Sequence, residues 1–127
     1  MIVDDPATLK EVKAKFTAYE TALMTNDVAA LDDFFWPSNL ALRFGVGESL
    51  FGFDAIAAFR AARGGSPPRQ LQATQITSFG TDYAVATTEF LREGEKRVGR
   101  QSQVWVKFPE YGWRIVSAHV SLVAGTS

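Results

Sequence analysis

The first part of the chain has the hydrophobic spacing of a helix. From Pro6 onward, apolar side chains recur every three or four residues, at Leu9, Val12, Phe16, Tyr19 and Leu23. This spacing places them along one stripe of a helix, which is the pattern of a helix packed against a core. Asp5 before Pro6 is a typical helix start, because aspartate caps free backbone N–H groups and proline fits the first helical position.

Two shorter helices are predicted after it. The segment 25–27, Thr-Asn-Asp, breaks the first helix and caps a second one over 28–35, which ends before Pro37. A third helix is predicted over 53–63, begun with the help of Asp54 and ended by the glycine pair that follows it.

The remaining segments alternate in the manner of strands. Two short ones come before the third helix and four longer ones after it, over 40–44, 49–51, 70–79, 83–92, 97–108 and 113–123. The short turns between the long strands favour antiparallel neighbours. Helices first and strands afterwards predict one α+β domain over 1–127. We expect a strongly curved antiparallel sheet to wrap around the long first helix and to leave a cavity at the mouth of this cone.

Composition narrows the classes of function. The 127 residues carry a net charge of −1, no cysteine and one histidine. Nucleic acids and anionic membranes call for a basic patch, so we expect neither as a partner. Without cysteine and with one histidine, only carboxylate-rich metal sites stay open, and we expect no metal and no cofactor. No apolar run reaches the roughly 18 residues of a membrane span, and the acidic N-terminus differs from a signal peptide, which predicts a cytoplasmic protein.

Arg43 interrupts an apolar strand and is the first candidate for chemistry. It follows Leu40, Ala41 and Leu42 and precedes Phe44 and a glycine. One interpretation is an arginine at a strand edge whose head reaches water. The other is a cavity arginine whose planar fork binds a carboxylate, with glycine allowing a ligand to approach the backbone.

Tyr19 lies in the middle of the apolar stripe, so its ring is expected to face the interior. One interpretation is a packed ring whose hydroxyl finds a backbone partner. The other is a phenol that donates a proton or a hydrogen bond to a substrate. Neither residue is decisive alone, but Tyr19 and Arg43 together form a candidate site.

The third helix places two arginines on an apolar face. Ile56, Phe59, Arg60 and Arg63 are spaced by three, four and seven residues, and therefore share one face. This face is either a solvated rim or a funnel for anions at the mouth of the pocket.

For the last two strands, the sequence does not determine which face points toward the cavity. Strict alternation puts Arg100 with Ser102, Val104 and Val106, opposite Gln101, Gln103 and Trp105. In the final strand it groups Trp113, Ile115, Ser117, His119 and Ser121. A lone strand histidine is usually structural, although His119 with Ser121 is a candidate pair for a small polar ligand.

The order of elements, ending in GWRIVSAHVS, resembles the NTF2-like or SnoaL-like superfamily. The segments LRFGVGESLFGFDAIAAFRAAR and GRQSQVWVKFPEYGWRIVSAHVSL resemble the AtzH-like family more closely, a family that includes HpxZ-type proteins of oxalurate catabolism. This resemblance implies bacterial nitrogen catabolism beside amidase-signature hydrolases, and an activity that deamidates or decarboxylates carboxylated ureas such as 1,3-dicarboxyurea.

The resemblance also implies roles for individual residues. The family's tyrosine and arginine match Tyr19 in FTAYETAL and Arg43 in LALRFG. Arg43 would hold a substrate carboxylate, and Tyr19 would protonate the leaving nitrogen or orient water. Aromatic walls and further polar groups complete the expected substrate site, which comprises Trp36, Phe44, Phe59, Arg60, Arg63, Arg100, His119 and Ser121.

Two other functions remain open at this stage. One is a non-catalytic binding or accessory protein of an amidase. The other is isomerisation with Glu89 or Glu48 as the base. We also expect a homodimer that pairs through the outer face of the sheet, since the last strands are apolar on both faces.

Overall fold

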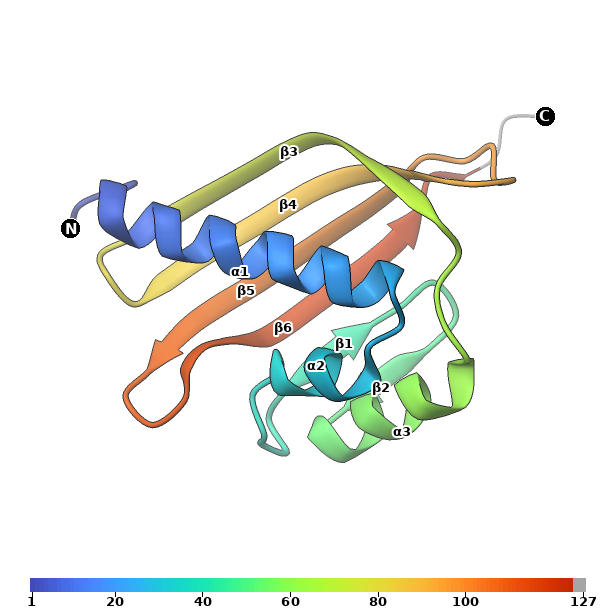
Figure 1. Cartoon of the computed structure of the whole chain (residues 1–127), viewed down its shortest axis with the longest axis horizontal. Helices are drawn as coiled ribbons and strands as arrows, with labels where there is room; N and C mark the ends of the chain where they lie inside the picture. The colour runs from blue at the N-terminus through green and yellow to red at the C-terminus, as the bar shows by residue number, and fades with distance from the viewer. Residues whose placement is uncertain (125–127) are drawn as a thin grey trace.

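Three helices lie against one face of a curved sheet of six strands (Figure 1). The computed structural model describes residues 1–124. The helices are α1 (Pro6–Met24), α2 (Val28–Asp33) and α3 (Phe53–Arg63). The strands are β1 (Leu42–Phe44), β2 (Ser49–Phe51), β3 (Arg69–Phe79), β4 (Tyr83–Arg92), β5 (Gly99–Phe108) and β6 (Gly112–Leu122). The α+β prediction and the cone of helices and curved sheet are confirmed.

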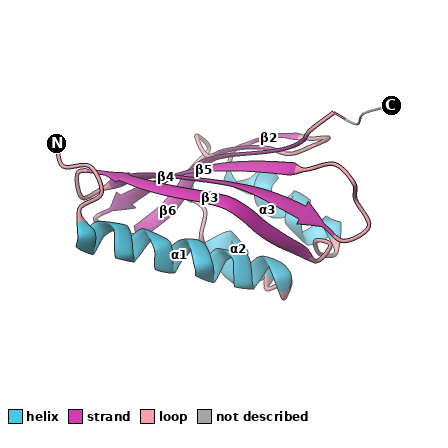
Figure 2. Cartoon of the chain, turned by 90° about the horizontal axis from the view of Figure 1, so that it is seen from above, coloured by secondary structure: helices cyan, strands magenta, loops and turns pink. Residues whose placement is uncertain are grey.

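The strand order is β2-β1-β6-β5-β4-β3, so the short β1–β2 pair extends the sheet beyond the last strand of the chain. Neighbouring strands are antiparallel except β1 and β6, which are parallel and pair Arg43 with Ala118. This parallel pair was not predicted, because it joins strands far apart in the sequence. Figure 2 shows the sheet curving over the helices, which all lie on its concave side.

The helix signals in the sequence act as expected. Asp5 caps α1, since its carboxylate accepts the backbone N–H of Thr8. Helix α2 ends at Asp33, two residues before the predicted end, because Phe35 instead forms a bridge to Ile115 of the sheet. Helix α3 has the predicted bounds, and the residue before it, Gly52, provides no side-chain cap. Among residues 1–124, none of the helices combines the length and apolarity needed to span a bilayer.

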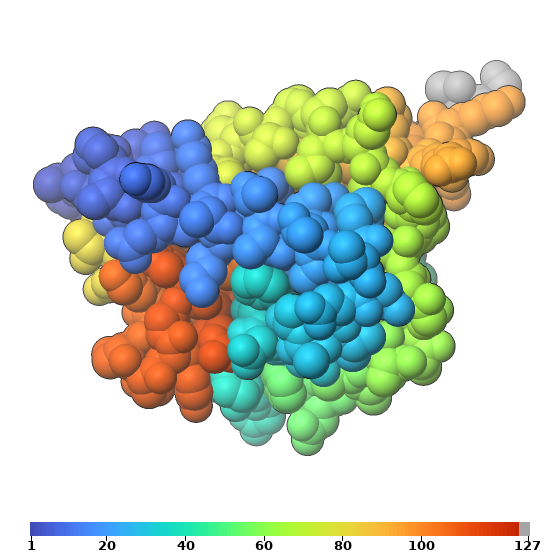
Figure 3. Space-filling view, in the orientation of Figure 1, coloured from blue at the N-terminus to red at the C-terminus, as the bar shows by residue number. Residues whose placement is uncertain are grey.

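The core lies between α1 and the concave face of the sheet. The helix stripe supplies Val12, Phe16 and Tyr19, and the largest fully buried side chain is Trp105 on β5. In Figure 3 the helices α1 and α2 cover the middle of this face, and the strands are visible around them. The packing therefore places Tyr19 inside the cone, as its position on the stripe predicted.

Strand β6 contains a bulge that corrects the predicted faces. Trp105 pairs with Ile115, whereas Val104 pairs with Ser117, so Val116 is the extra residue. Trp113 and Ile115 point inward before the bulge, but Ala118 and Val120 do so after it. The grouping of Trp113 and Ile115 with His119 was therefore wrong, because a bulge exchanges the two faces of a strand.

Candidate functional site

Arg43 points into the concave side of the sheet. It is the central residue of β1 and is 7% exposed. Its Nη1 donates to Oε1 of Glu48 at 2.8 Å, and its guanidinium lies 5.5 Å from the centre of the Phe59 ring. A β-carbon on Gly45 would overlap the Glu48 carboxylate, so the glycine allows Glu48 to fold back onto the arginine. The structure thus places Arg43 in the interior rather than at a solvated strand edge.

A cavity of about 250 Å³ opens beside Arg43. It lies between the β1–β2 loop, the end of α3 and the ends of β4 and β6. Its lining comprises Arg43, Val46, Glu48, Phe59, Arg63, Gly65, Ser66, Pro67, Arg92 and Val120. The volume is below the ~300–1,000 Å³ typical of pockets for drug-sized ligands, which suits a small molecule. Three arginines and one glutamate give this lining an excess of positive charge.

Arg63 lies across the Phe59 ring from the α3 side. Its guanidinium is 5.6 Å from the ring centre, so Arg43 and Arg63 both contact the same aromatic side chain. Burial lowers the pKa of Arg63, and the positive charges of Arg43 and Arg60 lower it further. Its Nε is buried and has no hydrogen-bond partner among the described residues. An arginine remains charged in proteins, so Arg63 is a cation that an anionic ligand would stabilise.

Arg92, at the end of β4, is a cavity residue that sequence analysis did not single out. Its guanidinium lies 5.2 Å from the centre of the Phe90 ring, and its buried Nε also lacks a partner. Burial lowers the pKa of Arg92, and the charges of Arg69 and Arg43 contribute in the same direction. The sequence signal was weak, because an arginine at the end of a strand next to a turn is usually a solvated residue.

Arg60 is buried on the same helix but does not line the cavity. It is 3% exposed, its Nε lies 3.9 Å from Oδ1 of Asp32, and its guanidinium is 5.6 Å from the Phe35 ring centre. Its Nε and Nη1 have no hydrogen-bond partner among residues 1–124. Burial raises the pKa of Asp32, against the opposing effect of Arg60. Arg60 thus belongs to the packing between α2 and α3 instead of a solvated rim.

Tyr19 is buried in the core, where it packs on the two aromatic residues that follow α2. Its ring makes edge contacts with Phe34 and Phe35, with centroids 5.7 and 6.5 Å apart. It is not among the cavity-lining residues, although a negative charge on it would raise the pKa of Arg63. The structure therefore buries Tyr19 in the core and leaves it out of the wall of the cavity.

The other predicted site residues lie elsewhere. Phe44 and His119 are register partners on the outer face of the sheet, with ring centroids 5.8 Å apart. Arg100 and Ser121 are also register partners there. Trp36 stacks on Phe108, with ring centroids 5.3 Å apart. None of these five residues lines the cavity beside Arg43, because four of them lie on the outer face of the sheet and Trp36 packs on Phe108.

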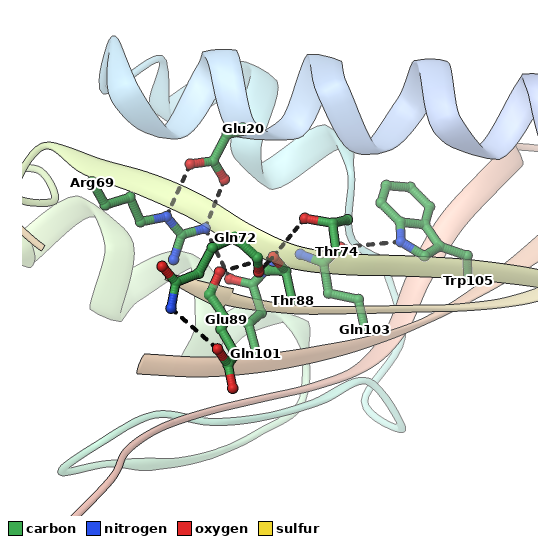
Figure 4. Close-up of polar contacts among 9 residues, drawn as sticks. All are labelled: Glu20, Arg69, Gln72, Thr74, Thr88, Glu89, Gln101, Gln103 and Trp105. Carbon is green, nitrogen blue, oxygen red and sulfur yellow. Dashed lines mark hydrogen bonds and ion pairs between the residues drawn. The ribbon is translucent and has the colours of Figure 1, made fainter. Parts of the chain in front are cut away.

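A buried polar network joins α1 to the sheet next to Arg92. Both Glu20 carboxylate oxygens accept from Arg69, at 2.9 and 2.7 Å. Nη2 of Arg69 also donates to Gln101 at 3.0 Å, which leaves the buried Nε2 of Gln101 without a partner among the described residues. Figure 4 shows Glu20 reaching down from α1 to this guanidinium. The network ties the helix turn after Tyr19 to β3 and β5.

Among the buried side-chain atoms that lack a hydrogen-bond partner, donors outnumber acceptors in the described residues. Unpartnered buried nitrogens occur on Arg60, Arg63, Arg92 and Gln101, whereas Asp32 and Ser78 are the unpartnered oxygens among residues 1–124. Buried donors normally have partners, so this excess favours a ligand that supplies acceptors and negative charge. The described residues contain no group of three or more histidines, aspartates and glutamates placed to hold a metal ion.

Comparison with known proteins agrees with this fold. The sequence model of the AtzH-like protein family matches residues 1–126. The chain belongs to the AtzH-like family. A DUF3225-family protein of unknown function from Pectobacterium atrosepticum is 51% identical, with a TM-score of 0.93 over 96% of this chain and 95% of that one.

Two further solved structures extend the likeness. A cystatin-like fold protein from Burkholderia xenovorans is 41% identical, with a TM-score of 0.95 and 99% of both chains covered. An NTF2-like superfamily protein from Salmonella enterica is 25% identical, with a TM-score of 0.75 over 95% of this chain and 94% of that one. No curated protein matches the chain. These likenesses establish family and fold, and no activity follows from them.

Proposed function

We propose that this AtzH-like protein binds a small carboxylated urea in the arginine cavity and releases CO2 from it. The observation that carries the proposal is the convergence of Arg43, Arg63 and Arg92 on one small cavity lined by a single carboxylate, that of Glu48. Such a lining favours an anion, and the unpartnered buried nitrogens of Arg63 and Arg92 favour one rich in acceptors. 1,3-Dicarboxyurea, a small molecule with two carboxylates, fits this chemistry.

The proposed reaction consumes one proton. The nitrogen beside one carboxylate of 1,3-dicarboxyurea is protonated, and the bond from that nitrogen to the carboxylate carbon breaks. The electron pair of this bond remains on nitrogen, and the carboxylate leaves as CO2. The product is allophanate, which keeps the second carboxylate.

The change in charge during the reaction assigns Arg43 to the carboxylate that the product retains. The departing carboxylate loses its charge as CO2 forms, so a guanidinium bound to it would stabilise the reactant more than the transition state. The retained carboxylate keeps its charge throughout, and Arg43 can hold it without opposing the reaction. Phe59 and Val120 offer the departing group an apolar wall in the same cavity.

Tyr19 is assigned as the proton donor. It is buried, and the positive charge of Arg63, which lines the cavity, would stabilise a phenolate left by proton transfer. A well-placed general acid contributes ~10²–10⁴-fold to a rate. Solvent then returns the proton to the phenol.

The second candidate is an accessory protein that binds the same ligand without turnover, beside an amidase-signature enzyme. One observation favours it: Tyr19, the proposed proton donor, is not among the residues that line the cavity. Glu48, which does line it, is bound to Arg43 and is not free to take part in proton transfer in its place.

Turnover by the isolated protein distinguishes the two candidates. We would follow the release of CO2 and the formation of allophanate from freshly generated 1,3-dicarboxyurea above the spontaneous rate, with Tyr19→Phe and Arg43→Ala in parallel. Tyr83→Phe is the matched control, because that tyrosine is exposed at the far end of β4. Acceleration lost in the first two variants and kept in the control supports the enzyme. Ligand binding by a wild-type protein that gives no acceleration supports the accessory protein.

A further inference from the structure

Arg92 and Arg43 approach the cavity from opposite sides. Arg43 lies on β1 and Arg92 at the end of β4, with β6 and β5 between these strands in the sheet. Both side chains nevertheless line the same cavity of about 250 Å³. The curvature of the sheet brings two cations to one small space, where a ligand with negative charge at both ends would contact each of them.

The neighbours of Arg92 leave its charge available to a ligand. Arg69, its register partner on β3, is neutralised by a two-point ion pair with Glu20. Glu95, in the turn after β4, is bound at both oxygens by Arg97. Arg92 itself packs on the Phe90 ring, which is fully buried, so the ring fixes the position of the guanidinium. Its buried Nε is a donor without an acceptor among residues 1–124.

We propose that Arg92 is a specificity-determining residue, which binds the second negative charge of the ligand while Arg43 binds the first. This inference deepens the proposed function, since it assigns a second subsite in the same cavity. It predicts that the site selects dianions over monoanions of equal size. The second charge belongs to the carboxylate that leaves, so the contact with Arg92 favours the bound substrate over the transition state and contributes selectivity instead of rate. The contact is lost when CO2 forms, which gives a reason for product release.

Stable probes test this selectivity without any reaction. Glutarate has the same number of atoms between its carboxylates as 1,3-dicarboxyurea, and glutaramate replaces one carboxylate with a neutral amide of nearly equal size. We would measure the dissociation constants of both by calorimetry at fixed, low ionic strength. Charge-assisted hydrogen bonds are roughly twice as strong as neutral ones, so the wild type should bind glutarate about ten-fold more tightly.

Substitutions at Arg92 separate its role from general loss of charge. Arg92→Gln should abolish the preference, so that the two dissociation constants become about equal, because the second subsite is then neutral. The binding of glutaramate should change little. Arg92→Lys should keep part of the preference, since it keeps the charge but loses the fork. Lys10→Gln is the charge-matched control, because Lys10 is exposed on α1, and it should retain the wild-type preference. Circular dichroism spectra confirm folding of each variant.

Two results would overturn the inference. One is a wild-type protein that binds the two probes equally. The other is an Arg92→Gln variant that folds and keeps the full preference for glutarate. Either result can occur together with tyrosine- and arginine-dependent turnover of 1,3-dicarboxyurea, so it would reject the second subsite and leave the proposed reaction in place. If the protein gives no turnover but keeps its preference for glutarate, the proposed reaction is rejected and the second subsite stands.

Discussion

Replacement of Glu20 by glutamine tests how the buried network holds α1 on the sheet. Glu20 binds Arg69 through both oxygens, and the side chain of Arg69 is only 2% exposed. The variant keeps the shape of the side chain but leaves the guanidinium without its counter-charge. Removal of one partner of a buried ion pair destabilises by ~3–5 kcal/mol.

The lower end of this range applies here. Arg69 would keep its hydrogen bond to Gln101 and its position 4.5 Å from the Phe90 ring centre. We therefore expect a loss of about 3 kcal/mol in the free energy of unfolding. For a chain of this size this corresponds to a melting temperature lower by roughly 10–15 °C.

The assay is equilibrium unfolding in urea, followed by tryptophan fluorescence and circular dichroism. Glu110→Gln is the matched control, because it makes the same chemical change at an exposed position, and its unfolding midpoint should equal that of the wild type. A loss below about 1 kcal/mol in Glu20→Gln, the range of surface pairs, would refute the reasoning. It would mean that water solvates Arg69 in place of the carboxylate.

Three further predictions concern packing, pH and assembly. Gly99→Ala should destabilise by ~1–3 kcal/mol in urea unfolding, because its β-carbon would overlap the buried Phe90 ring, whereas Gly47→Ala, with open space around it, should not. A hydrogen bond from Trp113 lowers the pKa of Glu11 below 4.5, so its stabilisation is present above about pH 5 and is lost as the pH falls through the folded-state pKa. The drop in melting temperature from pH 6 to pH 3 should accordingly be smaller in Glu11→Gln, and an equal drop would contradict this assignment. The proposed homodimer should show twice the 13.9 kDa chain mass in light scattering at micromolar concentration, and a monomer mass would reject it.

Local signals in the sequence predicted the elements well. The stripe of α1, the cap at Asp5 and the length of α3 follow from helix periodicity and from residues that begin or end helices. The inward position of Arg43 agrees with its place among apolar neighbours on β1. These features depend on contacts within a few residues, and a single sequence contains that information.

The candidate site was predicted only in part. Of the residues proposed from the sequence, Arg43, Phe59 and Arg63 line the cavity, whereas Arg100 and His119 lie on the outer face. Strict alternation misassigned the end of β6, because no residue type marks the bulge at Val116. Glu48 was considered only as a base, and its ion pair with Arg43 requires the turn that Gly45 permits.

The sequence by itself determined the helices, the strands and the family of this protein, because periodicity, capping and turn chemistry are local properties of the chain. Only the tertiary structure decided that β1 lies parallel to β6, that Arg69 is neutralised by Glu20, and that Arg92 reaches the cavity of Arg43. Each of these depends on the curvature of the sheet, which brings together side chains from strands that are not neighbours in the sequence. The charge of the cavity is therefore a property of the folded sheet rather than of any one segment.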